Sequence, residues 1–141
     1  MDFSFELDHI GIAVEGLESG FDFYRALGFT DMETEEVASE KVKVGFIKLG
    51  NRANLELLEP TTDDSTIRKF LDKRGPGIHH ICLRVKNIDQ LLEQLKSKGV
   101  RLINEKAKDG AHNCRVAFVH PASTGGVLIE LSEKKSGAAH G

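Results

Sequence analysis

The fold is decided by a short stretch that occurs twice, as Asp8-His9-Ile10-Gly11-Ile12-Ala13-Val14 and again as His79-His80-Ile81-Cys82-Leu83-Arg84-Val85. In both copies, aliphatic residues alternate with histidine and other residues, which is the period of a β-strand. An internal repeat of this kind predicts a chain built from two copies of one structural unit.

Each copy of the stretch is followed by the pattern of an amphipathic helix. Apolar residues step by four and three positions along one helical face, at Leu17, Phe21 and Tyr24 and then at Ile88, Leu92 and Leu95. Gly28 and Gly99 stand where each helix would end, because glycine readily adopts the left-handed backbone of a C-terminal cap. Asn87 is expected to cap the start of the second helix.

Three further strands are expected after each helix. The first half predicts strands near 5–14, 29–37, 41–49 and 53–59, and the second half predicts strands near 78–86, 100–106, 114–120 and 126–132. Between the halves, the helical spacing of Ile67, Phe70 and Leu71 predicts a linker helix near 62–75, capped by Asp63 or Asp64. The fold class is therefore α+β, with two tandem βαβββ modules at about 5–60 and 77–133.

Strand alternation separates the polar residues of the two modules from the aliphatic ones. His9 lies on the opposite strand face from Ile10, Ile12 and Val14. In the second copy of the stretch, His80 likewise lies on the opposite face from the aliphatic residues of its own strand. In the last strand of each module, Glu56 and Glu130 oppose leucine and isoleucine. We expect all four polar side chains to converge if the modules are related by a pseudo-twofold axis.

Two imidazoles and two carboxylates form a mixed nitrogen and oxygen ligand set for one divalent metal ion. Taken singly, a strand histidine is more often a packed, hydrogen-bonded residue, and a strand glutamate is more often exposed. The pairing of His9 with His80 and of Glu56 with Glu130 through the repeat favours the metal site. The absence of a thiolate from the set argues against a structural zinc site.

The other histidines are less informative. His79 lies on the same strand face as the aliphatic residues, so it is not expected to bind the metal. We expect it either to contact one of the ligand residues or to lie at the surface. His112 and His120 have no counterpart in the first half. His120 precedes Pro121 at a strand end, where it could orient a loop or touch a substrate.

Composition excludes several classes of function. With 141 residues, 40% of them hydrophobic, the chain suits one compact domain over 1–134, and the small polar residues 135–141 are expected to form a disordered tail. The net charge of −3 argues against nucleic-acid binding. No apolar run approaches the roughly 18 residues of a membrane span. Cys82 and Cys114 are interpreted as reduced thiols of a cytoplasmic protein without a signal peptide.

The two modules and their histidine and glutamate set resemble the vicinal-oxygen-chelate superfamily, and within it the methylmalonyl-CoA epimerase family. The resemblance runs from about residue 6 to residue 132. Its most specific segment is Phe118-Val119-His120-Pro121-Ala122-Ser123-Thr124-Gly125-Gly126-Val127-Leu128-Ile129-Glu130-Leu131. It implies a single vicinal-oxygen-chelate domain, an incomplete eight-stranded barrel around the metal, and a homodimer.

The resemblance also implies a reaction, the interconversion of (R)- and (S)-methylmalonyl-CoA through a metal-stabilised enolate. The implied cofactor is one divalent metal per chain on His9, Glu56, His80 and Glu130, with cobalt expected and nickel, manganese or zinc as alternatives. His120, Ser123, Thr124 and Gly125 could hold the acyl-CoA substrate through hydroxyl and backbone donors. A plain hairpin turn accounts for Ser123–Gly125 equally well.

One departure from the family concerns the bases. Some epimerases have a glutamine ligand in the first half and a separate glutamate base on the third strand, where this chain has Glu56 and Val44. We therefore expect Glu56 and Glu130 to act as proton carriers as well as ligands. Glu40 and His112 are the competing candidates for the second base.

Two other functions compete with epimerisation. Glyoxalase I, a lactoylglutathione lyase, can use the same four ligand types, but the segment from His120-Pro121 to Glu130 argues against it. A non-catalytic relative that binds small molecules, as bleomycin-resistance proteins do, would not need the paired ligands.

Overall fold

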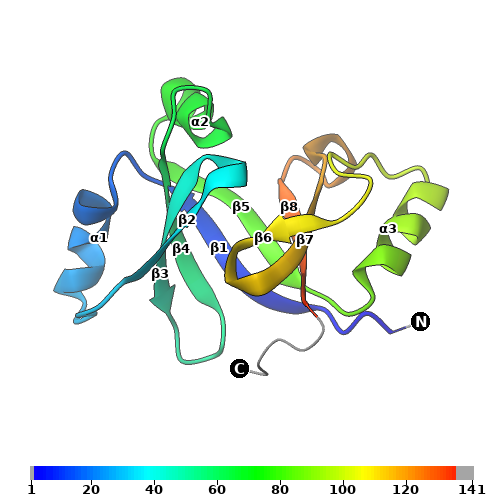
Figure 1. Ribbon diagram of the computed structural model, residues 1–141, viewed down its shortest axis with the longest axis horizontal. Helices are drawn as coiled ribbons and strands as arrows, with labels where there is room; N and C mark the ends of the chain where they lie inside the picture. Colours follow the sequence, from blue (N-terminus) through cyan, green and yellow to red (C-terminus); the bar gives the residue numbers. More distant parts are fainter. Residues whose placement is uncertain (1, 136–141) are drawn as a thin grey trace. The chain divides into compact units, whose positions relative to one another are not determined.

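The computed structural model describes residues 2–135, which form two compact units. The first unit is His9–His79, and the second unit combines residues 2–8 with residues 80–135. Within this described part, the chain has three α-helices and eight β-strands, labelled in Figure 1. Both unit boundaries fall inside strands, directly before His9 and directly before His80.

The first unit contains four strands, two helices and a short 3₁₀ helix. In chain order they are β1 (Glu6–Ala13), α1 (Leu17–Ala26), β2 (Glu33–Val37), the 3₁₀ helix Ala38–Glu40, β3 (Val42–Lys48), β4 (Asn54–Pro60) and α2 (Thr66–Arg74). The strands lie in the order β2-β3-β4-β1. β1 runs parallel to β4, and the other neighbours are antiparallel.

The second unit repeats this arrangement. Its elements are β5 (Gly77–Arg84), α3 (Ile88–Ser97), β6 (Lys108–Gly110), the 3₁₀ helix Ala111–Asn113, β7 (Cys114–Val119), the 3₁₀ helix Pro121–Ser123 and β8 (Ile129–Lys134). The strand order is β5-β8-β7-β6, with β5 parallel to β8. The predicted α+β class with two βαβββ modules and eight strands is confirmed.

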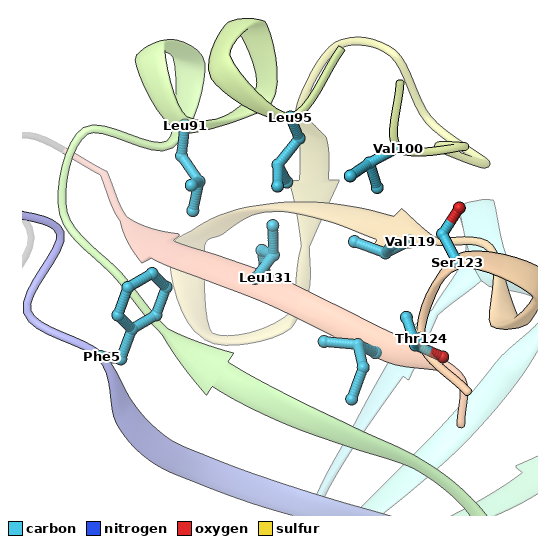
Figure 2. Close-up of a pocket in the computed structure, with 9 residues that line it drawn as sticks. Phe5, Leu91, Leu95, Val100, Val119, Ser123, Thr124 and Leu131 are labelled. Atoms are coloured by element: carbon cyan, nitrogen blue, oxygen red, sulfur yellow. The ribbon is translucent and has the colours of Figure 1, made fainter. Parts of the chain in front are cut away.

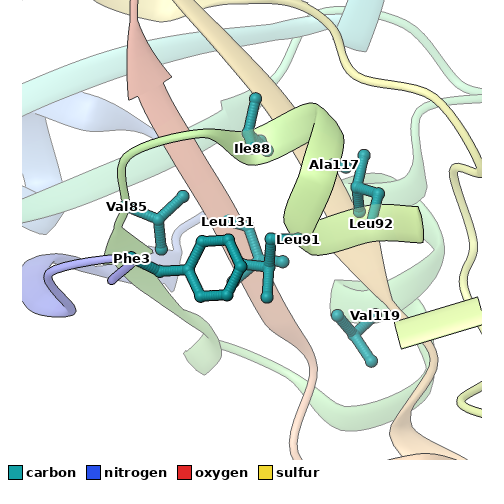
Figure 3. Packing of buried hydrophobic residues seen from close by; sticks show 8 residues of the cluster. All are labelled: Phe3, Val85, Ile88, Leu91, Leu92, Ala117, Val119 and Leu131. Carbon is teal, nitrogen blue, oxygen red and sulfur yellow. The ribbon is translucent and has the colours of Figure 1, made fainter. Parts of the chain in front are cut away.

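Each unit buries the aliphatic faces of its strands under its own helix. In the first unit, Leu17 and Phe21 of α1 pack with Val14, Ile47 and Leu57. The equivalent cluster of the second unit places α3 over the strands, as Figure 3 shows, and consists of Phe3, Val85, Ile88, Leu91, Leu92, Ala117, Val119 and Leu131. Because strand side chains alternate, this packing leaves His9, Glu56, His80 and Glu130 on the opposite faces.

The predicted ends of the helices are correct at the glycines but wrong at two starts. Gly28 and Gly99 follow their helices with φ angles of 110° and 80°. Helix α2 is capped by Ser65, whose Oγ accepts hydrogen bonds from the backbone of Ile67 and Arg68, and not by Asp63 or Asp64. Asn87 stands at the start of α3, but its side chain forms no capping bond.

The strand predicted near 100–106 is also wrong. Leu102 forms only an isolated bridge to Val119, and the regular strand β6 begins later, at Lys108. The reason lies in Asn104, whose side-chain oxygen accepts the backbone N–H of Phe118 at 2.8 Å. This bond takes a donor that a regular strand pair would have used, so the ladder does not continue.

Three other expectations concern the chain as a whole. Cys82 and Cys114 are buried and form no disulfide, as expected. None of the helices within residues 2–135 is both long and apolar enough to cross a membrane. Of the tail expected at 135–141, all but Lys135 lies outside the described residues.

Candidate metal centre

The first unit brings His9 and Glu56 into contact. They lie on the neighbouring parallel strands β1 and β4, where the Cα partner of Glu56 is Gly11. Nδ1 of His9 is 3.0 Å from Oε2 of Glu56. Each residue is only 6% exposed. The predicted first-half residues therefore form a buried pair, close enough to share a proton or to bind one ion.

The second unit builds the same pair from β5 and β8. Nε2 of His80 is 3.0 Å from Oε1 of Glu130, and the residues are 5% and 9% exposed. The ring of Phe118 on β7 meets the His80 imidazole edge-on, with 5.6 Å between ring centroids. Packing against Phe118 restrains the ring plane, which helps to preorganise a histidine ligand.

The donor chemistry of the two pairs fits a divalent cation. A buried carboxylate is costly unless it is hydrogen-bonded, paired with a positive group or bound to a metal. Each unit buries one such carboxylate beside one imidazole, at positions equivalent in the repeat. Cobalt, nickel, manganese and zinc all accept nitrogen and oxygen ligands of this kind.

Sequence reasoning missed the phenylalanines beside the two glutamates. Phe46 on β3 is the cross-strand partner of Glu56, and Phe118 on β7 is the partner of Glu130. Directly paired residues of antiparallel strands lie on the same face. Each of the two glutamates therefore has an aromatic neighbour on its own strand face. Aligning the third strands of the two halves would have revealed this equivalence.

The residues predicted to hold substrate form the loop before β8. Nδ1 of His120 accepts the backbone N–H of Ala122 at 3.0 Å, and Oγ of Ser123 accepts that of Arg101 at 2.9 Å. The hydroxyl oxygen of Thr124 accepts the N–H of Val127. Gly125 has a φ of 80°, which favours glycine. These bonds fix the path into β8 and thereby the position of Glu130.

The remaining candidates lie elsewhere in their units. His79 packs edge-on against Phe70 of α2, with 5.1 Å between ring centroids. Glu40 ends the 3₁₀ helix before β3, and His112 lies in the corresponding 3₁₀ helix before β7, with a φ of 55°. The structure thus places Glu40 and His112 at matching turns of the two units.

An ion pair and two thiols complete the polar residues near β5. Nη2 of Arg84 donates to Oδ1 of Asp8 at 2.7 Å, and Nε of Arg84 donates to the same oxygen at 3.0 Å. Cys82 is the Cα partner of Glu130. Burial raises the pKa of the Cys114 thiol, so Cys114 stays protonated near neutral pH.

A cavity in the second unit is lined in part by Ser123 and Thr124 of the predicted substrate loop, but not by His80 or Glu130. Its volume is about 220 Å³, and Leu91 and Leu95 of α3 point into it opposite Leu131 (Figure 2). Leu131 neighbours Glu130 along β8 and so faces the other side of the strand. The cavity therefore belongs to the helix face and is separate from the candidate ligand pair.

Comparison with known proteins gives consistent matches over most of the chain. A model of the Glyoxalase/Bleomycin resistance protein/Dioxygenase superfamily matches residues 8–118. The mitochondrial methylmalonyl-CoA epimerase of Homo sapiens is 43% identical over 129 residues, which cover 90% of this chain and 73% of that protein.

Solved structures of similar proteins share the fold, and two of them illustrate the match. Methylmalonyl-CoA epimerase from Mycobacterium tuberculosis has a TM-score of 0.86 at 40% identity, over 92% of this chain and 88% of that one. A variant of the Streptomyces coelicolor methylmalonyl-CoA epimerase, in complex with 2-nitronate-propionyl-CoA, has a TM-score of 0.83 at 34% identity, over 92% and 97% of the two chains.

Proposed function

Because the chain belongs to the methylmalonyl-CoA epimerase family of the Glyoxalase/Bleomycin resistance protein/Dioxygenase superfamily, we propose that it interconverts (R)- and (S)-methylmalonyl-CoA. The observation that carries this proposal is the buried histidine–glutamate pair at the same place in both units. The family relationship supplies the substrate, and the paired donors supply a site able to handle a proton and negative charge.

One divalent cation per chain is proposed to be held by His9, Glu56, His80 and Glu130. Cobalt is the first choice, and nickel, manganese and zinc have compatible ligand preferences. When bound, such a cation would act as a Lewis acid that stabilises negative charge developing on the substrate.

The proton is proposed to be moved by the two glutamates. The α-carbon of methylmalonyl-CoA lies between a thioester and a carboxylate, and loss of its proton leaves a planar enolate. One carboxylate takes the proton from one face, and the other, as a carboxylic acid, returns a proton to the opposite face. Glu56 and Glu130 suit these roles because they occupy equivalent positions in the two units.

The loop before β8 is proposed to contact the substrate. Its candidate residues are His120, Ser123, Thr124 and Gly125, which lie directly ahead of the strand that carries Glu130. The related Streptomyces coelicolor enzyme was solved with an acyl-CoA analogue, which supports an acyl-CoA ligand here. A single domain over 1–134, a homodimer and a cytoplasmic location complete the proposal.

Hydrogen exchange provides the test. The metal-loaded protein in heavy water should wash deuterium into the α-position of methylmalonyl-CoA, and it should convert one pure epimer into a mixture. The same preparation should not isomerise the hemithioacetal of methylglyoxal and glutathione. Turnover of the hemithioacetal without exchange into methylmalonyl-CoA would instead assign a glyoxalase I activity.

A further inference from the structure

The ligand face of the first unit is apolar on one side of Glu56. Strand register places Gly11 of β1 on one side of Glu56 and Phe46 of β3 on the other. The next pair along the same face is Val44 with Leu58. Val44, Phe46 and Leu58 are all buried, so an aliphatic and aromatic surface lies on one side of this glutamate. The polar neighbours on the same face are His9, which contacts Glu56, and Glu35 of β2, which pairs with Val44.

The equivalent face of the second unit is more polar. Glu130 lies between Cys82 of β5 and Phe118 of β7. The next pair along that face is Val116 with Ser132. The phenylalanine and the valine are therefore common to both faces, whereas Gly11 and Leu58 are replaced by Cys82 and Ser132.

This difference matters for a substrate with unlike groups around its α-carbon. A charged carboxylate loses hydration without compensation on an aliphatic surface, whereas an alkyl group gains by leaving water there. Gly11 adds to the contrast, because it presents no side chain beside Glu56, where the second unit has the thiol of Cys82.

We infer that the α-alkyl group of the substrate packs on the ligand face of the first unit, and that Val44 limits the length of that group. This inference rests on the proposed epimerase function and adds a determinant of substrate size. Both epimers share one planar enolate, in which the alkyl group keeps its direction while hydrogen changes faces. One apolar wall therefore serves both epimers.

The test compares two matched valines. Val44→Ala removes the proposed wall, and Val116→Ala makes the same change at the equivalent place of the second unit, where the residue is similarly buried (3% and 5% exposed). The readout is the kcat/KM for ethylmalonyl-CoA divided by that for methylmalonyl-CoA. Val44→Ala should raise this ratio at least about tenfold. This is the lower end of the discrimination that an apolar pocket achieves for one methylene group.

Further variants keep the inference falsifiable if Val44→Ala folds poorly. Val44→Ile adds a methylene and should lower the ratio by about tenfold. Each change should be the same from either epimer, and Val116→Ala should leave the ratio within about twofold of the wild-type value. Equal effects at both valines, or no effect of Val44→Ile, would overturn the inference. Wild-type protein inactive on both thioesters would instead refute the epimerase function.

Discussion

At the residue scale, the central feature is a carboxylate held against an imidazole in each unit. Glu56 reaches Nδ1 of His9, whereas Glu130 reaches Nε2 of His80, each at 3.0 Å. The two histidines thus present different ring nitrogens to equivalent glutamates. Such a pair can hold a cation when the imidazole is neutral and the carboxylate is charged.

Replacing each glutamate separately tests its role as a proton carrier. Glu56→Gln keeps an oxygen ligand but cannot take a proton, so deuterium should still enter one epimer while exchange into the other falls by about 10²–10⁴-fold. Glu130→Gln should show the opposite preference. Proton-exchange rates measured by NMR from each pure epimer provide the comparison.

Metal content is the control for these two variants. Elemental analysis should show the ion retained in both, so that lost exchange reflects lost acid–base chemistry. If Glu56→Gln keeps its metal and epimerises at the wild-type rate, Glu56 is a ligand only. Glu40 and His112 would then be examined as the second base.

At the element scale, β4 and β8 carry the candidate ligands Glu56 and Glu130, and each of these strands also supplies a second glutamate that caps a helix. Oε1 of Glu59 on β4 accepts the backbone N–H of Leu17 at 2.8 Å at the start of α1. Glu133 on β8 accepts the N–H groups of Asn87 and Ile88, at 2.8 and 3.1 Å, at the start of α3. Each strand therefore carries a candidate ligand on one face and a helix cap on the other.

These caps predict a graded loss of stability. Glu133→Ala should lower the free energy of unfolding by about 1–2 kcal/mol, because two N–H groups lose their acceptor and the helix dipole loses a negative charge. Glu59→Ala removes one bond and should cost less. Urea denaturation measures both, with the exposed Glu105→Ala as the control. A Glu133→Ala protein as stable as the control would contradict the capping role.

Helix periodicity and end glycines were predictable, but the partners that begin the helices were not. Asn87 and Asp63 were reasonable caps on residue type alone. The actual acceptors are Glu133, which is 46 residues from Asn87, and Ser65. The cap from Glu133 depends on packing between distant parts of the chain, which local sequence patterns do not encode, whereas Ser65 is a local cap. The same reason explains why Asn104 interrupts the expected strand.

At the scale of the whole molecule, the proposed ion needs both units. Each unit offers one imidazole and one carboxylate, and the proposed site uses all four. A ligand that binds only the folded protein stabilises it by about 2.7 kcal/mol at a hundred times its Kd. Stripping the metal with a chelator should therefore lower Tm by roughly 5–10 °C, as measured by calorimetry.

His80→Ala supplies the control for this thermal shift. The variant should contain little metal and should melt at the same temperature with or without chelator. Restoring the cation to stripped wild-type protein should restore its Tm. A wild-type Tm unchanged by complete metal removal would show that the four residues do not hold a stabilising ion.

The sequence by itself determined the two βαβββ modules and the aliphatic residues that face the helices. It also determined that His9, Glu56, His80 and Glu130 lie on the opposite strand faces. These features follow from local periodicity, because each side chain's direction depends on its own strand or helix. Only the tertiary structure decided which residues meet across strands. It paired Phe46 with Glu56, brought Glu133 of β8 to the start of α3, and set Val44 beside Leu58 on one ligand face. Such contacts join residues far apart in the chain, so strand register and packing decide them.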